Sequence, residues 1–223
     1  MPPGPAETDR SARKPLKSES SWMEREIRSQ PGELQRLAEQ GTGVAREIAA
    51  EIQRYRPRFV IVAARGTSDR AAIYAKYLFE IELGIPVALA APSVVSLYQR
   101  PLEVAQTLVI GISQSGQSPD VVGVLDAAHG SGALTLAITN DPASPLAKAA
   151  GRVFDLGVGA ERSVAATKTF TAQLFAIWLL VAALKPGTRA AVDVGRVTTD
   201  AIARAERTWT RGNRSFGQEA VEV

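Results

Sequence analysis

Apolar residues in the first third of the chain recur at helical spacing and then change to short continuous runs. Residues 22–56 carry the helical pattern. The apolar positions that fall near one face there are Leu34, Leu37, Val44, Ile48 and Ile52. Proline restricts a helix interior, so Pro31 is expected to divide this stretch into a short and a longer helix. Pro57 is expected to end it.

Short apolar runs from Phe59 onward are typical of strands buried on both faces of a parallel sheet. The expected strands are 59–63, 86–90, 107–112, 133–139 and 153–158. Helical segments are expected near 69–83, after Pro119, before Pro186 and over 188–211. This alternation predicts an α/β fold with a doubly wound, parallel five-stranded sheet and a helical N-terminal extension.

The pattern divides the chain into four parts. Residues 1–21, rich in proline, serine and charge, are expected to be a disordered tail, with no apolar run typical of an export signal. The N-terminal helices occupy 22–57, the sheet domain 58–186, and a C-terminal helix with a truncated remainder 187–223. The most apolar stretch, 172–184, is too short to span a bilayer, so we expect a cytoplasmic protein with no membrane partner.

Composition removes several classes of chemistry. The 223 residues include no cysteine, which excludes disulfides, thiolate metal sites and a cysteine nucleophile. His129 is the single histidine, which argues against a multi-histidine metal site or a Ser-His-Asp triad. Lys+Arg number 26 against 23 Asp+Glu, and this small, dispersed excess does not favour a nucleic-acid partner. No metal or cofactor is expected.

Two loops are candidates for binding a phosphate. In a sheet of order 2-1-3-4-5, ligands bind beyond the carboxyl ends of the first and third strands. These strands are followed by Gly66-Thr67-Ser68 and by Ser113-Gln114-Ser115-Gly116-Gln117-Ser118. Each loop lies at a helix N-terminus, where free amides, hydroxyls and the helix dipole favour an anion. The alternative is that these hydroxyls only cap helices, and Ser118 before Pro119 is expected to be a cap in either case.

A third loop, 161–168, precedes the apolar helix. Arg162 there is interpreted as a solvated charge in a capping turn. The alternative is that Thr167 and Lys168 face the ligand crevice at the carboxyl ends of the first and third strands.

These motifs resemble those of a known family. Residues 113–120 closely resemble the Ser-Gln-Ser-Gly-Glu-Thr-x-Asp motif of sugar isomerase (SIS) domains in glucosamine-6-phosphate synthases. The 66–68 loop resembles their Cys-Gly-Thr-Ser loop, and 164–174 resembles their Val-Ala-Ser-Thr-Lys-x-Phe-Thr-x-Gln-Leu. Weaker matches are Met23-Glu24-Arg25-Glu26-Ile27 with Gln30-Pro31, Asn140-Asp141, and Ser144-Pro145-Leu146-Ala147. The resemblance covers roughly 22–184.

The resemblance implies roles for individual residues. Those implied to hold a phosphate are Ser113, Gln114, Ser115 and Ser118. Those implied to lie at the sugar are Thr67, Ser68, Val164 and Thr167. The chain departs from the family at Ala166, where a serine usually contacts the sugar, and more mildly at Gln117 and Ser118. The ligand expected is a sugar phosphate such as fructose 6-phosphate or glucosamine 6-phosphate.

The sequence lacks several groups that catalysis in the related enzymes requires. Without a cysteine or a glutaminase domain, glutamine-dependent amide transfer by this polypeptide alone is excluded. Related isomerases and deaminases use two SIS domains, and the residues after Lys185 are too few for a second. Isomerisation also needs a base. Glu161 is a weak candidate, and the alternative for it is a solvated or capping glutamate. His129 is expected to be structural, because it ends a helix just before Gly130.

Three hypotheses follow. We favour a shortened relative of aminosugar-phosphate isomerases and deaminases that retains ligand binding, with a homodimer as the expected assembly. The alternative is a non-catalytic sugar-phosphate sensor or interaction module, although residues 1–21 cannot form a helix-turn-helix. The third is a small isomerase that completes its site across a dimer.

Overall fold

The fold is a computed structural model that describes residues 21–100, 103–185, 200–205 and 207. Its elements, in chain order, are α1 (Trp22–Tyr55), β1 (Phe59–Ala64), α2 (Thr67–Leu83), β2 (Val87–Leu89), α3 (Ser93–Ser96), β3 (Thr107–Ser113), α4 (Pro119–Gly130), β4 (Leu134–Thr139), α5 (Pro145–Ala149), β5 (Arg152–Asp155) and α6 (Lys168–Leu184).

Five parallel strands form one sheet in the order β2-β1-β3-β4-β5, which confirms the predicted fold class and strand order. Central β3 pairs with β1 and β4 over six residues each, with Ile110 opposite both Val62 and Leu136. The fifth strand ends at Asp155, earlier than predicted. Gly157 and Gly159 follow with positive φ angles of 60° and 66°, and these turn the chain away from the sheet.

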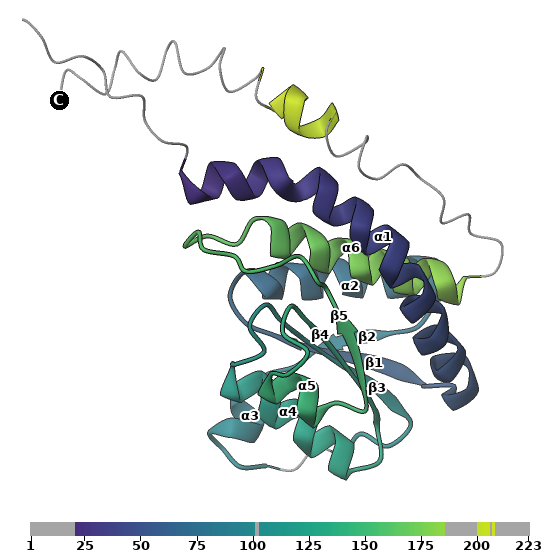
Figure 1. Ribbon diagram of the computed structural model, residues 1–223. Coiled ribbons are helices and arrows are strands. Elements are labelled where there is room, and N and C mark those ends of the chain that lie inside the picture. Colours follow the sequence, from purple (N-terminus) through teal and green to yellow (C-terminus); the bar gives the residue numbers. More distant parts are fainter. Residues whose placement is uncertain (1–20, 101–102, 186–199, 206, 208–223) are drawn as a thin grey trace, which may run out of the picture.

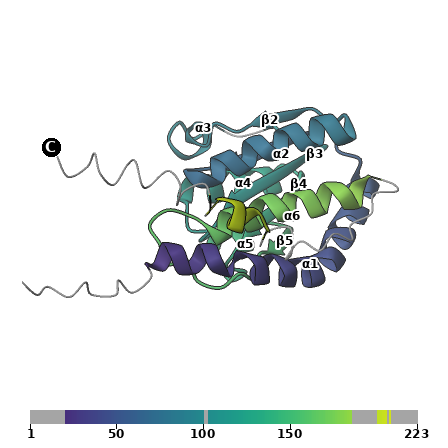
Figure 2. The same cartoon turned by 90° about the horizontal axis from the view of Figure 1, so that it is seen from above.

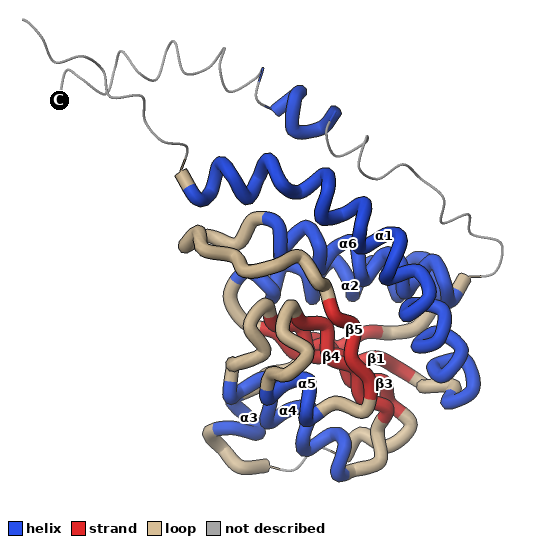
Figure 3. Tube along the Cα trace, viewed as in Figure 1, coloured by secondary structure: helices blue, strands red, loops and turns tan. Residues whose placement is uncertain are grey.

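Helices cover both faces of the sheet (Figure 1). One layer holds α2 and α6 with α1 lying over α6, and the other holds α3, α4 and α5. Figure 3 shows the strands enclosed between these two layers. Phe79, Phe154 and Ile177 belong to the core on the α2/α6 side, while Val121 and Leu125 belong to the core on the α4 side. The continuous apolar runs of the strands are therefore explained by burial on both faces.

The N-terminal extension differs from the prediction, because Pro31 lies inside a single helix of 34 residues. A proline removes one helical hydrogen bond, but the helix continues when packing compensates for that loss. On α1 the compensating stripe includes Leu34, Leu37 and Ile48, which are buried in the core that α1 forms with α6. At Gly41, an added Cβ would lie 3.1 Å from the Phe154 ring, so the helix approaches the domain closely at this position.

The predictions for the chain ends fall mostly outside the described residues. Ser21 is described, and its hydroxyl caps α1 by accepting the Glu24 amide at 3.2 Å. Residues 200–205 and 207 are helical, within the helix predicted over 188–211. In the part of the chain that is described, no helix is both long and apolar enough to cross a membrane.

Candidate functional site

A cavity of about 240 Å³ lies at the carboxyl ends of β1 and β3, the position where the strand order reverses. We call it the switch-point cavity. Its lining residues are Arg65, Thr67, Ser68, Ser113, Gln114, Ser115, Ser118, Ser163, Val164, Ala166 and Gln173. Three loops that are far apart in the sequence thus meet in one place, and all but one of the predicted binding residues line the cavity. The exception is Thr167.

The 113–118 loop is shaped by its own hydroxyls. Ser113 Oγ accepts the Gly116 amide at 3.1 Å, and Ser115 Oγ accepts the Gln117 amide at 3.3 Å. A hydroxyl that accepts from the loop still has its hydrogen to donate. Both serines can therefore donate to an anion in the cavity while they hold the loop in shape.

The same loop is fastened to the next strand and helix. The Gln114 carbonyl accepts the Asn140 amide at 3.0 Å, and the Gly116 carbonyl accepts the Leu146 amide at 3.1 Å. Gly116 has a φ angle of +62°, and a Cβ there would lie 2.1 Å from Ser144 Oγ. Glycine is therefore required at this position by both backbone conformation and space.

Helix N-termini surround the cavity, as the sequence predicted. The helix α2 begins at Thr67 and α4 begins at Pro119, so both present their amino ends to the carboxyl edge of the sheet. Ser118 occupies the N-cap position of α4, as expected, but its hydroxyl makes no capping hydrogen bond. Arg65 adds positive charge, with its guanidinium 3.6 Å from Asp120 in the first turn of α4. The dipoles and this cation favour an anion.

Gln173 on α6 is the most buried polar side chain of the cavity wall, with 1% of its surface exposed. Its Nε2 donates to Ser68 Oγ at 3.0 Å. Its Oε1 is buried and has no hydrogen-bond partner among the residues that the structure describes. The pair joins α6 to the first turn of α2 at Ser68, which was itself predicted to lie at the sugar.

The 161–168 loop departs from the prediction at its two ends. Glu161 Oε1 accepts from the Thr167 amide and hydroxyl at 2.6 Å each, and from the Lys168 amide at 3.0 Å. Its Oε2 accepts from the amide and hydroxyl of Thr169. The carboxylate of Glu161 therefore caps α6, which is the alternative to a catalytic role that the sequence left open. Thr167 faces Glu161 rather than the cavity, and Lys168 is buried outside the cavity lining.

His129 lies at the opposite end of α4 from the cavity. Its Nδ1 is 3.4 Å from Thr135 Oγ1. The structure therefore places the single histidine in the packing of α4 against β4, away from the switch-point cavity.

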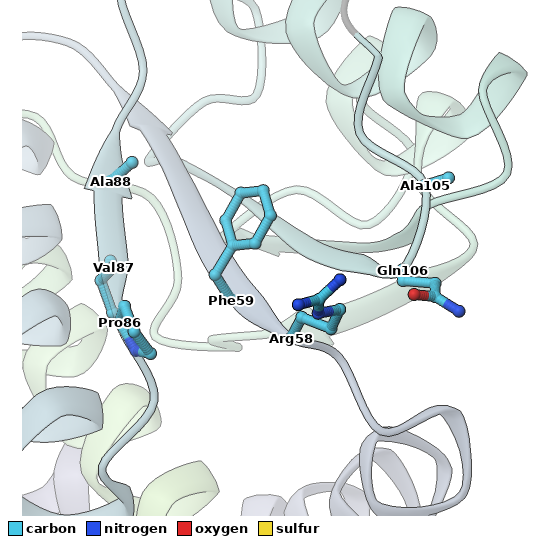
Figure 4. A pocket seen from close by; sticks show the side chains of 7 residues that line it. All are labelled: Arg58, Phe59, Pro86, Val87, Ala88, Ala105 and Gln106. Atoms are coloured by element: carbon cyan, nitrogen blue, oxygen red, sulfur yellow. The ribbon is translucent and has the colours of Figure 1, made fainter.

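A larger hollow of about 660 Å³ opens at the amino ends of β1, β2 and β3. Figure 4 shows the Phe59 ring and the Arg58 side chain between Pro86-Val87-Ala88 and the Ala105-Gln106 segment. Among its described lining residues Arg58 is the one charged residue, and none begins a helix. Parallel α/β sheets bind ligands at the carboxyl ends of their strands, where the switch-point cavity lies. The polar lining residues are also found in that cavity, so we assign the site to it and not to the larger hollow.

Four lining residues were not among the predicted binding residues: Arg65, Ser163, Ala166 and Gln173. Arg65 directly precedes the Gly66 turn, and Gln173 lies one turn into α6, within the 164–174 motif. The sequence shows where Arg65 and Gln173 stand relative to these motifs. Whether their side chains face the cavity depends on the packing of α2 against α6, which the sequence does not show. Among the described lining residues none is a carboxylate or a histidine. No cluster of histidine, aspartate and glutamate suited to a metal is found among the residues described.

Sequence comparison places these loops in a known family. The SIS domain model matches residues 55–183. Glutamine–fructose-6-phosphate aminotransferase [isomerizing] of Gloeobacter violaceus is 39% identical over 168 residues, covering 71% of this chain and 27% of the relative. The enzyme of the same name from Methanothermobacter thermautotrophicus is 38% identical over 166 residues, covering 73% and 27%.

Solved structures similar to this chain include proteins named as phosphosugar isomerases. A proposed phosphosugar isomerase from Silicibacter pomeroyi is 41% identical with a TM-score of 0.75, over 81% of this chain and 55% of that one. Tagatose-6-phosphate ketose/aldose isomerase from Escherichia coli shares the fold, with a TM-score of 0.65 and 19% identity over 82% and 53%. The chain thus spans about a quarter of the length of the curated relatives and about half of these two structures. Because the family model matches more than half of its residues, the chain belongs to the SIS domain family.

Proposed function

We propose that this chain binds a sugar phosphate in the switch-point cavity, with the phosphate on the 113–118 loop. The observation that carries this is the meeting of the β1 and β3 loops with two helix N-termini in one polar cavity. Amides and hydroxyls at a helix N-terminus bind phosphate without a metal. Arg65 supplies a guanidinium suited to phosphate oxygens at the same rim.

The phosphate is proposed to lie against Ser113, Gln114, Ser115 and Ser118. The hydroxyls of Ser113 and Ser115 are already oriented by the loop amides they accept, so little ordering is needed on binding. The Ser118 hydroxyl is available because it does not cap α4.

The sugar is proposed to lie between the 66–68 loop and the 163–166 loop. Thr67 and Ser68 line one side, with Ser163, Val164 and Ala166 on the other. The Val164 side chain is fully exposed at the tip of its loop, so it can cover a bound sugar. The curated relatives are named for fructose 6-phosphate, which gives the class of ligand to test first.

Binding is the part of the reaction that the described cavity supports. Moving a proton between C1 and C2 of a sugar needs a base near those atoms. Glu161 is engaged in capping α6 and lies outside the described lining, which contains no carboxylate. We therefore propose that the chain alone binds the ligand without isomerising it, as a phosphosugar-isomerase-like domain related to the isomerase part of the aminotransferases.

A homodimer is retained as a proposal. The apolar helix α6 is covered by α1 and contributes to the core. A dimer would therefore use another surface, and light scattering measures its presence directly.

Isothermal titration with fructose 6-phosphate and glucosamine 6-phosphate tests the proposal. We expect saturable binding to the wild type and at least a tenfold loss in the Ser113→Ala/Ser115→Ala variant, since each lost hydrogen bond to a charged group costs about 1.5–3 kcal/mol. Ser131→Ala is the matched control because Ser131 follows the other end of α4. Absence of binding to folded wild type, or equal binding by the double variant, would reject the proposal.

A further inference from the structure

Glu26 is a buried charge near the start of α1 whose role is not explained by packing. Only 5% of its surface is exposed. Its Oε1 accepts the Arg162 amide at 2.5 Å and its Oε2 accepts the Ser163 amide at 3.1 Å, across more than 130 residues of sequence. A buried carboxylate is costly unless it is paired, and here both oxygens have partners in one loop.

The environment of Glu26 favours its charged form. Burial by itself raises its pKa, but hydrogen bonding by the Ser163 side chain and by the amides of Arg162 and Ser163, together with the charge of Lys168, outweighs this and leaves the pKa below its ordinary value. Glu26 is therefore a carboxylate at neutral pH and acts as an acceptor only.

A second contact joins the same two segments. The Arg162 guanidinium lies 4.5 Å from the centre of the Trp22 ring, and the Arg25 guanidinium lies 4.8 Å from it. Such cation–π contacts contribute on the order of 0.5–1 kcal/mol at exposed positions. Figures 1 and 2, in views that differ by 90°, both show the beginning of α1 beside the loop that leads into α6. The loop is thus fixed through both its backbone and its Arg162 side chain.

This loop forms one wall of the switch-point cavity. At its start and end it is held to α6 by Glu161. Between these points Glu26 holds two amides, and the next residues, including Ser163, Val164 and Ala166, line the cavity. The position of this wall therefore depends on a carboxylate from a helix that does not itself line the cavity.

We propose that Glu26 is a positioning residue for the ligand: by holding the amides of Arg162 and Ser163, it fixes the 163–166 wall of the cavity in its binding position. Ligand affinity then depends on the docking of α1. The effect on affinity rests on the proposed function, whereas the effect on the loop does not.

Glu26→Gln is the direct test because it keeps the shape of the side chain. A carboxamide presents one oxygen and one NH₂ group, so one of the two loop amides would face a donor instead of an acceptor. We expect on the order of tenfold weaker binding of fructose 6-phosphate or glucosamine 6-phosphate, as for one lost charge-assisted hydrogen bond. Glu24→Gln is the control, because Glu24 is exposed on the same helix and pairs with Arg28.

Hydrogen exchange followed by NMR supplies a readout that is independent of the ligand. We expect the amides of Arg162 and Ser163 to exchange faster in Glu26→Gln, while the amides of β3 and β4 keep their protection. Trp22→Ala removes the exposed ring of the cation–π contact. We expect it to raise the exchange rates of the same two amides as well, but by a smaller factor than Glu26→Gln does. It carries the test if Glu26→Gln does not fold.

The outcomes separate the two proposals. Weaker binding with faster loop exchange and an intact sheet supports the positioning role. Wild-type affinity, or unchanged exchange at the two amides, overturns it. If the wild type binds neither sugar phosphate, the proposed function fails, and the exchange at Arg162 and Ser163 still decides whether Glu26 holds the loop.

Discussion

Gln173 on α6 donates through Nε2 to the hydroxyl of Ser68 on α2, with 3.0 Å between the two atoms. An oxygen that accepts this bond keeps its own hydrogen for another partner. Since Ser68 lines the switch-point cavity, that hydrogen is available to a ligand there. Gln173, on the helix that closes the domain, thus determines where the hydroxyl hydrogen of Ser68, near the start of the domain, can point.

Replacing Gln173 with Leu should separate ligand affinity from stability. The change removes the bond to Ser68. It also removes Oε1, a buried atom without a hydrogen-bond partner in the described part of the chain, so the free energy of unfolding should change by no more than about 1–2 kcal/mol. Sugar-phosphate affinity should fall several-fold, because Ser68 loses its fixed orientation. Urea denaturation and calorimetry measure the two quantities. Wild-type affinity in Gln173→Leu would contradict the assigned role.

Gly116→Ala should destabilise the domain. The new Cβ would meet Ser144 at 2.1 Å, and the positive φ disfavours any residue with a Cβ. Together these effects are expected to lower the free energy of unfolding by about 2–5 kcal/mol. Gly43→Ala is the control: Gly43 lies on an exposed part of α1 with nothing near its Cβ, so this change should stabilise by about 0.5–1 kcal/mol. Equal chemical denaturation of Gly116→Ala and wild type would refute the geometry of the loop.

Ala166→Ser should strengthen binding. Ala166 lines the cavity at the position where the family usually has a serine at the sugar. An added hydroxyl that reaches the sugar would contribute about 0.5–1.5 kcal/mol, or up to about tenfold in the dissociation constant. The same substitution at Ala165, which is exposed and outside the lining, is the control. A drop in affinity for Ala166→Ser would place the sugar elsewhere.

The contribution of Glu26 to stability should depend on pH. Its pKa in the folded chain lies below the ordinary 4.5, so its stabilising effect is present above that value and is lost as the pH falls through the folded pKa. The difference in free energy of unfolding between wild type and Glu26→Gln should therefore be constant near neutrality and shrink below pH 4.5. The other charged groups of these segments, Arg25, Glu161, Arg162 and Lys168, are present in both proteins, so their contributions largely cancel in the difference. Denaturation at pH 7 and pH 4 measures this, and a difference that grows on acidification would be the wrong sign.

The sheet and its switch point could be predicted because they depend on local patterns. Buried parallel strands read as continuous apolar runs, and the loops after β1 and β3 carry their own glycines and hydroxyls. The continuity of α1 through Pro31 could not be predicted, because it depends on a stripe of contacts with α6 that is more than 100 residues away in sequence.

The candidate site was predictable to a similar extent. The two loops were predicted from their place after the first and third strands, whereas the roles of single residues, such as Ser113 and Thr67, were implied by the family resemblance. Side-chain direction was less accessible: Thr167 follows Val164 by three residues, but it turns toward Glu161. Glu26 and Gln173 stand in motifs of the sequence, but their roles could not be predicted from it, because those roles depend on contacts between distant segments.

The most direct test of the account is amide NMR mapping with glucosamine 6-phosphate, with glucosamine alone as the reference. The account predicts saturable shifts at 66–68, 113–118 and 162–166, with little change for the sugar that lacks phosphate. Shifts confined to the hollow near Arg58 and Phe59, or equal shifts with both sugars, would contradict phosphate binding at the switch-point cavity.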